Sequence, residues 1–411
     1  MDKIYDALIV GAGASGLMAS VGLKSVNKSL NVLILEKNEK IGKKIYITGK
    51  GKCNVTNNST TQNIVENIVH NGKFLYGSLN KFSPSEVINF FEDNGCKLKT
   101  ERGNRVFPVS EKASDIIKVF QQFINKNDVE LKVNSNVSKV KLDANLFEVY
   151  SNNEVYKSKN LIIATGGKSY PLTGSNGDGY QFAKNFGHTI TTLRPALCGF
   201  KVKKIDELQG LTLKNIELKV VVDEKVKFKE FGDITFYKNL VAGPLCLTAS
   251  SLLNSYNKFD FVIDLKPKVE ENEFKERFYN VYNSSKNESF ITFLQNFMPS
   301  KLAEYIAHKY SINKKERIKN LSSNLIKEIQ QSIKNLKFNN LTLDDIENGI
   351  VTAGGINIKE INPSNMESKI TDNLYFVGEV LDLDAFTGGY NMQIAFTTGY
   401  ICGKYIAEKS Y

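Results

Sequence analysis

One short tract of the 411-residue chain gathers residue types that could do chemistry. The tract GKKIYITGKGKCNVTN, Gly42–Asn57, holds four lysines, three glycines and the thiol of Cys53. Lysines beside glycines could bind the phosphates of a nucleic acid or of a cofactor, and a thiolate activated by lysines could act in redox chemistry. The helices and strands predicted around the tract are needed to choose between these uses.

The segments before the tract form a pattern that is typical of dinucleotide binding. Tyr5–Val10 predicts a buried strand, GAGASG (Gly11–Gly16) follows it directly, and the next apolar residues continue with helical spacing. A second predicted strand, Asn31–Leu35, then ends at Glu36. A G-x-G-x-x-G motif between a strand and a helix, with an acidic residue about 20 positions further on, indicates an adenine dinucleotide site.

Each glycine of this motif has a physical role. Gly11 permits the tight turn, Gly13 lets backbone amides approach a pyrophosphate, and Gly16 lets helix and strand pack closely. Glu36 follows Gly16 by 20 residues, where a carboxylate can accept hydrogen bonds from ribose hydroxyls and would repel a 2′-phosphate. These residues favour FAD and NAD equally, and they disfavour NADP.

Later segments of the chain favour FAD. An NAD domain is usually one continuous block, whereas an FAD domain of the glutathione-reductase type takes its site from scattered segments. Val133–Val140 predicts a strand whose backbone near Val137 could pair with the adenine edge, and Asn160–Ala164 predicts another that turns at Thr165–Gly167 beside the dinucleotide. No second strand–GxGxxG–helix unit follows in the sequence, so a dedicated NAD domain is not expected.

The last segment of the chain suits a flavin. Leu374–Val377 predicts a strand that leads into Gly378-Glu379, and a helix is predicted from about Tyr390 to Ala407 after Gly388-Gly389. Glu379 stands where a carboxylate could bind ribityl hydroxyls, and the start of the helix would point its free amides at the N1/C2 edge of the flavin. Such a dipole end favours the negative charge of a reduced flavin by roughly 0.3 to 1 kcal/mol.

The five cysteines show no disulfide or metal pattern. Their number is odd, their spacing is wide and no C-x-x-C pair occurs, so neither a disulfide framework nor a metal site is expected. A redox role for Cys53 would need a second thiol, and the next one along the chain is Cys96. We therefore interpret Cys53 as a buried structural cysteine in preference to an activated thiol.

The charge and hydropathy of the chain bear on its partners and location. The net charge of +10 could suggest a polyanionic partner, but the excess lysines are scattered and no recognition motif accompanies them. A nucleic-acid partner is therefore not expected. No apolar segment reaches the eighteen or so residues of a membrane span, and the run Ala7–Val10 is too short for a signal peptide. We expect a cytoplasmic protein with no membrane partner.

Six motifs together resemble those of one protein family. They are GAGASGL, TGKGKCNVTN, GNRVFPVSEKASD, ATGGKSYPLTGSNGDGYQFAKNFGH, TAGGINIKEINPSNMESK and YFVGEVLDLDAFTGGYNMQIAF. In this set and order the chain resembles the bacterial BaiN-like flavoproteins, a group that includes aminoacetone oxidase-like enzymes. The resemblance implies an α/β fold: a Rossmann-like FAD-binding domain of the glutathione-reductase type, interrupted by an insert with a β-barrel-like sheet and a helical part.

The resemblance also places segments around a non-covalently bound FAD. The tract from Lys43 to Asn57 would lie along the pyrophosphate and flavin, and Gly388–Gln393 around the ribityl chain and isoalloxazine. Lys52 stands where many relatives have the arginine of a GGGRCN-like loop, which keeps the charge but loses the bidentate fork. The predicted cofactor-binding residues are Gly11, Gly13, Ala14, Ser15, Gly16, Glu36, Lys37, Lys43, Lys44, Thr48, Gly49, Gly51, Cys53, Asn54, Val137, Thr165, Gly166, Gly167, Gly378, Glu379, Gly388, Gly389, Tyr390, Asn391 and Gln393.

The pattern of the chain changes within the expected insert. Apolar and polar residues alternate from Leu211 to Val220, which predicts a half-buried antiparallel strand, whereas Phe274–Ile333 has helical spacing. We expect the first part of the FAD-binding domain at residues 1–192, an insert at 193–340 and the second part at 341–411. Within the insert, the sheet or barrel is expected at 193–268 and the helical part at 269–340.

These observations predict an FAD-dependent oxidoreductase. It would move a hydride between a small organic substrate and the flavin, with O2 as a possible acceptor, as in amine oxidases. The alternative is an NAD(P)H-dependent reductase of an unsaturated or keto compound, and a nucleic-acid-associated flavoprotein ranks third. Hydride transfer requires no protein nucleophile, so no catalytic residue is assigned. The sequence does not predict the oligomeric state.

Overall fold

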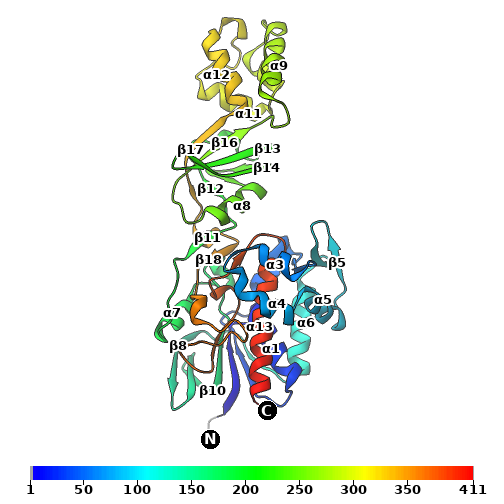
Figure 1. Ribbon diagram of the computed structural model, residues 1–411, viewed down its shortest axis with the longest axis vertical. Helices are drawn as coiled ribbons and strands as arrows, with labels where there is room; N and C mark the ends of the chain where they lie inside the picture. The colour runs from blue at the N-terminus through cyan, green and yellow to red at the C-terminus, as the bar shows by residue number, and fades with distance from the viewer. Residues whose placement is uncertain (1–2, 411) are drawn as a thin grey trace. The chain divides into compact units, whose positions relative to one another are not determined.

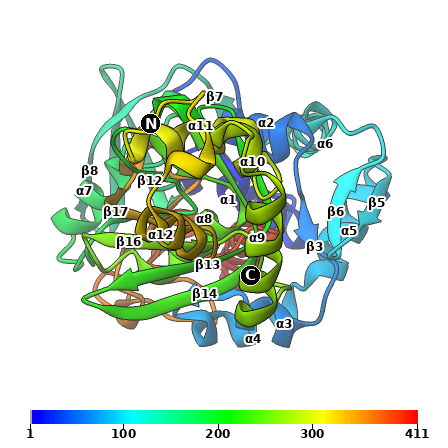
Figure 2. The ribbon, with the colours of Figure 1, turned by 90° about the horizontal axis from the view of Figure 1, so that it is seen from above.

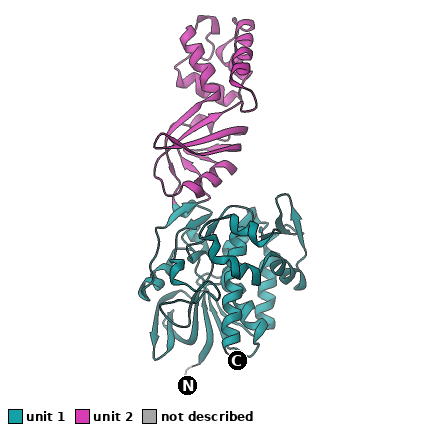
Figure 3. Cartoon of the chain, viewed as in Figure 1, with its two compact units in different colours: residues 1–196, 346–411 teal, residues 197–345 magenta. Residues whose placement is uncertain are grey.

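The structure is a computed structural model that describes residues 3–410. The chain divides into two compact units, shown in different colours in Figure 3. Unit 1 consists of Met1–Ala196 and Ile346–Tyr411, and unit 2 of Leu197–Asp345. None of the helices within residues 3–410 has the length and apolar character that a membrane crossing requires.

A seven-stranded sheet forms the centre of unit 1 (Figure 1). Its strands lie in the order β7 (Glu130–Lys132), β2 (Val32–Leu35), β1 (Ile4–Val10), β10 (Glu154–Ile163), β9 (Leu146–Ser151) and β8 (Val137–Asp143), and β19 (Leu374–Phe376) pairs with β10. The strands β7, β2, β1, β10 and β19 pair in parallel, whereas β10, β9 and β8 pair antiparallel. Ala7–Val10, Val32–Leu35 and Leu161–Ile163 are buried throughout, as expected of parallel strands covered on both faces.

Two helices of unit 1 pack against each other along their length, α1 (Ala14–Val26) and α13 (Tyr390–Lys409). Figure 1 shows them side by side, although one lies near the start of the chain and the other at its end. Glycines line the contact: a Cβ added at Gly399 would lie 2.2 Å from the carbonyl oxygen of Ser15, and one at Gly403 would lie 2.1 Å from that of Ala19. The two backbones are therefore in direct contact.

Shorter elements complete unit 1. Its other helices are α2 (Lys43–Ile47), α3 (Thr61–Glu66), α4 (Tyr76–Lys81), α5 (Pro84–Asp93), α6 (Ala113–Lys126) and α7 (Asp178–Asn185). Its small sheets are formed by β3 (Thr56–Asn57), β5 (Leu98–Glu101) and β6 (Arg105–Pro108), by β4 (Ile68–His70) with β20 (Asp384–Ala385), and by β11 (Arg194–Ala196) with β18 (Val351–Ala353).

Unit 2 contains a closed barrel and a group of helices. The barrel runs in the order β12 (Phe200–Lys201), β15 (Leu240–Ala242), β14 (Lys225–Tyr237), β13 (Thr212–Val222), β16 (Phe259–Asp264) and β17 (Leu336–Leu343). The long neighbours β13 and β14 are seen clearly in Figure 2. The helices are α8 (Pro244–Leu253), α9 (Glu271–Ser284), α10 (Phe290–Gln295), α11 (Ser300–Lys309) and α12 (Ser323–Lys334). The chain returns from α12 into the barrel at β17.

The predicted α/β fold, with an insert that contains a barrel-like sheet and a helical part, is confirmed. Two predicted strands differ from the structure. The strand predicted at Asn160–Ala164 is the end of the longer β10, Glu154–Ile163. The pattern of Val133–Val140 predicts an extended segment, but β8 begins only at Val137. Asn134 has a φ of +53°, and the backbone N–H groups of Asn134 and Ser135 donate to Asn38 O and Glu36 O at 2.9 and 2.8 Å. The chain therefore turns beside the end of β2 before it enters β8.

The glycines between α1 and α13 give the first testable prediction. Gly403→Ala places a methyl group 2.1 Å from the Ala19 carbonyl oxygen, so the helices must separate, and we expect about 1 to 3 kcal/mol less stability. Gly77→Ala on α4 is the matched control, because a Cβ there meets nothing within 4 Å. Urea unfolding followed by circular dichroism measures both variants. An unfolding midpoint of Gly403→Ala equal to that of Gly77→Ala would contradict the close contact.

Candidate cofactor site

The glycine loop between β1 and α1 has two closed positions and one open position. Gly11 has a φ of +105°, and a Cβ there would lie 2.6 Å from the carbonyl oxygen of Ala164. A Cβ at Gly16 would lie 2.0 Å from the carbonyl oxygen of Gly11. A Cβ at Gly13, by contrast, meets no atom within 4 Å. The loop therefore leaves open space at the N-terminus of α1, where the free amides of a helix attract an anion such as a pyrophosphate.

Glu36 follows the carboxyl end of β2, and its carboxylate contacts this loop. Only 7% of the residue is exposed, and Oε2 accepts a hydrogen bond from Ala12 N at 2.8 Å. Its Oε1 accepts from the backbone N and side-chain Nδ2 of Asn38 at 2.9 and 2.6 Å. Asn38, which the sequence did not single out, also donates to Thr173 O at 3.1 Å. The structure thus brings the predicted ribose-binding carboxylate next to the predicted pyrophosphate loop.

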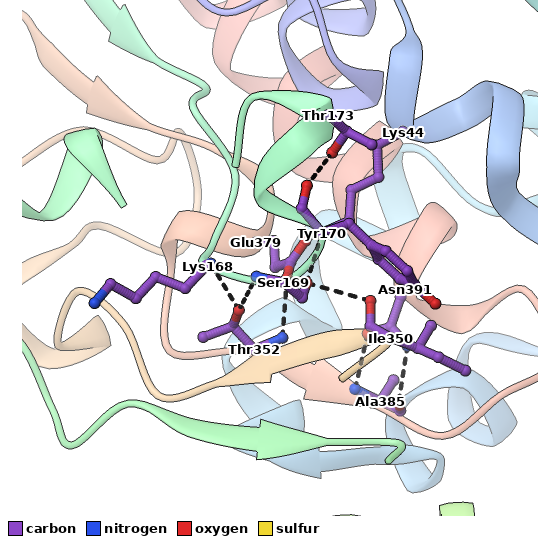
Figure 4. A network of polar contacts seen from close by, with 10 residues as sticks. All are labelled: Lys44, Lys168, Ser169, Tyr170, Thr173, Ile350, Thr352, Glu379, Ala385 and Asn391. Carbon is purple, nitrogen blue, oxygen red and sulfur yellow. Dashed lines mark hydrogen bonds and ion pairs between the residues drawn. The ribbon is translucent and has the colours of Figure 1, made fainter. Parts of the chain in front are cut away.

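A second carboxylate, Glu379, follows β19 and holds a network of polar contacts (Figure 4). Its Oε2 is 2.7 Å from Lys44 Nζ, and its Oε1 accepts from Ser169 Oγ at 3.0 Å and from Thr352 N at 2.9 Å. Lys44 Nζ also donates to Ser169 Oγ at 2.7 Å. The Lys44 and Glu379 side chains are 23% and 20% exposed, so the pair is partly buried. Glu379 therefore joins α2, the loop after β10 and β18.

The sequence did not single out Ser169 and Thr352 in this network. Both lie inside motifs of the family resemblance, but the residues that each contacts in this network are distant in sequence. Thr352 Oγ1 accepts from the backbone N–H groups of Lys168 and Ser169 at 2.8 and 3.1 Å, which fixes the loop after the Thr165–Gly167 turn. The other predicted lysine, Lys43, instead lies 3.1 Å from Glu39. Phosphate binding by either lysine stays a prediction.

The tract around Cys53 forms a tight loop with several left-handed residues. The φ angles of Gly49, Lys50, Gly51 and Cys53 are +57°, +58°, +86° and +59°. Cys53 has no exposed surface, and burial raises the pKa of its thiol to about 12. The thiol is thus protonated at neutral pH, which fits the interpretation of a structural cysteine. Lys52 pairs with Glu111 at 2.6 Å.

The start of α13 packs against β3. A Cβ at Gly389 would lie 2.4 Å from Thr56 C and O, and Asn57 Nδ2 donates to Gly388 O at 3.0 Å. Gln393 is fully buried, where its Nε2 donates to Phe82 O at 3.3 Å and its Oε1 accepts from Thr56 Oγ1. The Gln393 side chain therefore fastens α13 to β3 and to the end of α4.

Several buried polar atoms near these segments have no hydrogen-bond partner within the part of the chain that the structure describes. They are Asn54 Oδ1, Asn57 Oδ1, Thr165 Oγ1 and Asp384 Oδ2. Buried polar atoms nearly always have a partner, so unpaired ones at a site indicate a ligand or water that supplies it. Together with the open side of Gly13, these atoms fit a polar dinucleotide cofactor such as FAD.

The fold and the site define a class of protein, the Rossmann-like flavoproteins. The chain belongs to the HI0933-like family: the family model described as "HI0933-like protein Rossmann domain" matches residues 5–405. The predicted resemblance to the BaiN-like flavoproteins, the FAD cofactor and the assignment as an FAD-dependent oxidoreductase are confirmed. The individual cofactor-binding residues stay predictions.

Curated relatives match the chain over its length. It is 28% identical to the 3-dehydro-bile acid delta(4,6)-reductase of Clostridium scindens, with 98% of each chain covered. It is 29% identical to the ribosomal RNA dihydrouridine synthase of Haemophilus influenzae, with 100% of each covered. Among solved structures, the 3-ketosteroid delta1-dehydrogenase of Sterolibacterium denitrificans is 11% identical at a TM-score of 0.54, with 99% of this chain and 100% of that one covered. This last likeness concerns the fold alone.

Gly13 gives a test of the cofactor site. Gly13→Ala adds a methyl group where no protein atom lies within 4 Å, so we expect the apoprotein to keep its stability within about 1 kcal/mol. The same methyl group occupies the space predicted for the pyrophosphate, so the Kd for FAD should rise by at least about tenfold, or 1.4 kcal/mol. Quenching of FAD fluorescence gives the Kd, and Gly77→Ala is again the control. Unchanged FAD affinity would remove Gly13 from the site.

Cys53 gives a second test. Cys53→Ser should keep FAD and most turnover, because a buried thiol whose pKa is raised to about 12 is not a nucleophile at neutral pH. Thiol titration of the native wild-type protein should leave Cys53 unmodified. If Cys53→Ser bound FAD normally but lost its turnover, the interpretation as a structural cysteine would be wrong.

Proposed function

We propose that the protein adds hydrogen across a carbon–carbon double bond that is conjugated with a carbonyl group. The observation that carries this proposal is the chemistry shared by the names of two relatives that match over nearly their whole length. A 3-dehydro-delta(4,6) bile acid has double bonds conjugated with a ketone, and dihydrouridine is uridine with its pyrimidine C=C bond reduced. The substrates differ, but each reduction delivers a hydride to one carbon and a proton to its neighbour.

The residues of this chain would bind and orient the cofactor for that reaction. When bound and reduced, FAD supplies a hydride. The amides at the start of α1, next to Gly13, would bind the pyrophosphate, and Glu36 would accept hydrogen bonds from the ribose. Glu379, held in place by Lys44 and Ser169, would bind the ribityl chain. The start of α13 would stabilise negative charge on the flavin by about 0.3 to 1 kcal/mol.

The electrons for this reduction would come from NAD(P)H that binds only transiently. The sequence contains one strand–GxGxxG–helix unit, and the proposed FAD site uses it. Amine oxidation with O2 remains the competing function, and aminoacetone tests it directly. The relatives' names supply the reason to favour the reductase.

The substrate would be a small unsaturated ketone or a uridine in ribosomal RNA. The first agrees with the expectation of a small-molecule substrate. The second is supported by the match with the Haemophilus influenzae relative, whose name gives a ribosomal RNA activity. The net charge of +10 is compatible with attraction to the phosphate backbone of RNA, but the scattered lysines do not by themselves indicate a nucleic-acid partner.

Separate half-reactions test the proposed function. The purified holoprotein is reduced without air by NADPH, by NADH or by aminoacetone, and the loss of the yellow flavin absorbance is followed. A 3-oxo-4,6-diene bile acid or unmodified ribosomal RNA is then added. We expect NAD(P)H to reduce the flavin and one of the two probes to reoxidise it with formation of the reduced product.

Two outcomes of the half-reaction experiment would contradict the proposal. One is reduction by aminoacetone followed by peroxide release in air, which would establish the oxidase. The other is a reduced flavin that neither unsaturated probe reoxidises. Reoxidation by ribosomal RNA, but not by the bile acid, would identify a uridine in ribosomal RNA as the substrate.

A further inference from the structure

A histidine–aspartate pair lies where β4 meets β20. The two strands are antiparallel, with His70 opposite Asp384, and His70 Nδ1 lies 2.5 Å from Asp384 Oδ1. Asp384 has no exposed surface, whereas the His70 side chain is 39% exposed. Neither Asp384 Oδ2 nor His70 Nε2 has a hydrogen bond to any of residues 3–410. One ring nitrogen is thus held by a buried carboxylate while the other is left for a ligand or solvent.

This pair is fastened to the start of α13. Asn391, in the first turn of that helix, accepts a hydrogen bond from Ala385 N at 3.0 Å and donates one to Ala385 O at 2.7 Å. Figure 4 shows these two bonds. Directly after β4, Asn71 Nδ2 donates to Asp382 O at 2.8 Å. The imidazole is therefore fixed to the helix terminus that is predicted to face the flavin.

We propose that His70, oriented by Asp384, is the proton donor that completes the reduction of the substrate double bond. This inference rests on the proposed function. The hydride supplied by reduced FAD forms a C–H bond at one carbon, and the proton of His70 Nε2 forms a C–H bond at its neighbour as the π bond breaks. NAD(P)H supplies the two electrons. The imidazole left behind takes a proton from water, which reaches the exposed part of the ring.

The charges around the pair favour the protonated imidazole. The hydrogen bond to Asp384 raises the pKa of His70 above its ordinary value, the charges of Asp384 and Asp382 act in the same direction, and burial and Arg194 oppose them. Burial raises the pKa of Asp384, and the nearby charges of Asp382 and Glu379 add to this, whereas His70 lowers it. A general acid needs its proton near the working pH, and a histidine raised by a carboxylate meets that condition.

Two substitutions and a control measure the proton transfer. His70→Gln should keep FAD and the rate of flavin reduction by NADPH, but it should slow reoxidation by the effective probe about 10²- to 10⁴-fold, as expected for loss of a general acid. Asp384→Asn keeps the imidazole but loses the carboxylate. His308→Gln is the control, because that side chain is 77% exposed and belongs to unit 2.

A measurement without turnover separates proton donation from a purely structural bond. The chain has only three histidines, so the ring protons of isotope-labelled histidine can be assigned by NMR in the holoprotein with His70→Gln and His308→Gln. The pKa of His70 should be above its ordinary value and should fall in Asp384→Asn. Because imidazolium is the active form, the reoxidation rate should be constant below this pKa and fall above it. The falling limb should move to lower pH in Asp384→Asn by the same amount as the NMR pKa.

Each possible outcome supports or contradicts the inference. Reoxidation of His70→Gln at the wild-type rate, or a pH profile that does not follow the NMR pKa, overturns the inference and leaves the proposed function standing. A wild-type protein that neither probe reoxidises contradicts the proposed function, and the inference falls with it. Slow reoxidation of His70→Gln with normal flavin reduction, together with matched shifts in Asp384→Asn, supports both.

Discussion

The contact between α1 and α13 is the constraint on which the cofactor site depends. Its glycines bring two backbones together: a Cβ at Gly22 would lie 2.3 Å from the carbonyl oxygen of Tyr400, and one at Gly399 would lie 2.2 Å from that of Ser15. The turn after β19 joins the same contact, because a Cβ at Gly378 would lie 2.5 Å from Ser15 Oγ. Close packing of this kind tolerates almost no added volume. The start of the chain and its last helix are thereby held in one fixed arrangement.

This arrangement places the predicted cofactor residues at one edge of the sheet. Gly11 follows β1, Glu36 follows β2, the Thr165–Gly167 turn follows β10 after Ala164, and Gly378-Glu379 follows β19 closely. These four strands pair in parallel, so their carboxyl ends meet at the same edge. Ligands of open α/β sheets bind at such an edge, because loops and helix N-termini converge there. The scattered order of the residues in the sequence is thus the consequence of parallel pairing.

The sequence predicts the local parts of this site and misses the long-range pairs. The strand–glycine–helix unit with Glu36 has a signal within one short segment, so the pattern alone reveals it. Lys44 and Glu379 are 335 residues apart, and His70 and Asp384 are 314 apart, so no spacing rule could join them. The strands β4 and β20 contain three and two residues, too few for a periodic pattern. The residue pattern does not predict the turn at Asn134, because tertiary contacts with Asn38 and Glu36 set this turn.

The proposed reduction requires two groups in fixed positions, one that supplies a hydride and one that supplies a proton. These two groups do not determine which unsaturated compound is the substrate. In the proposed reaction, the hydride source would be positioned by the predicted FAD-binding segments of unit 1. The proposed proton donor, His70, belongs to the same unit and is tied to α13 through Asp384, Ala385 and Asn391. One packing arrangement would then position both groups, whatever unsaturated carbonyl compound is the substrate. Under the proposed function, relatives named for a bile acid and for ribosomal dihydrouridine would share a reaction while differing in substrate, because function resides in the site and the fold only supplies its frame.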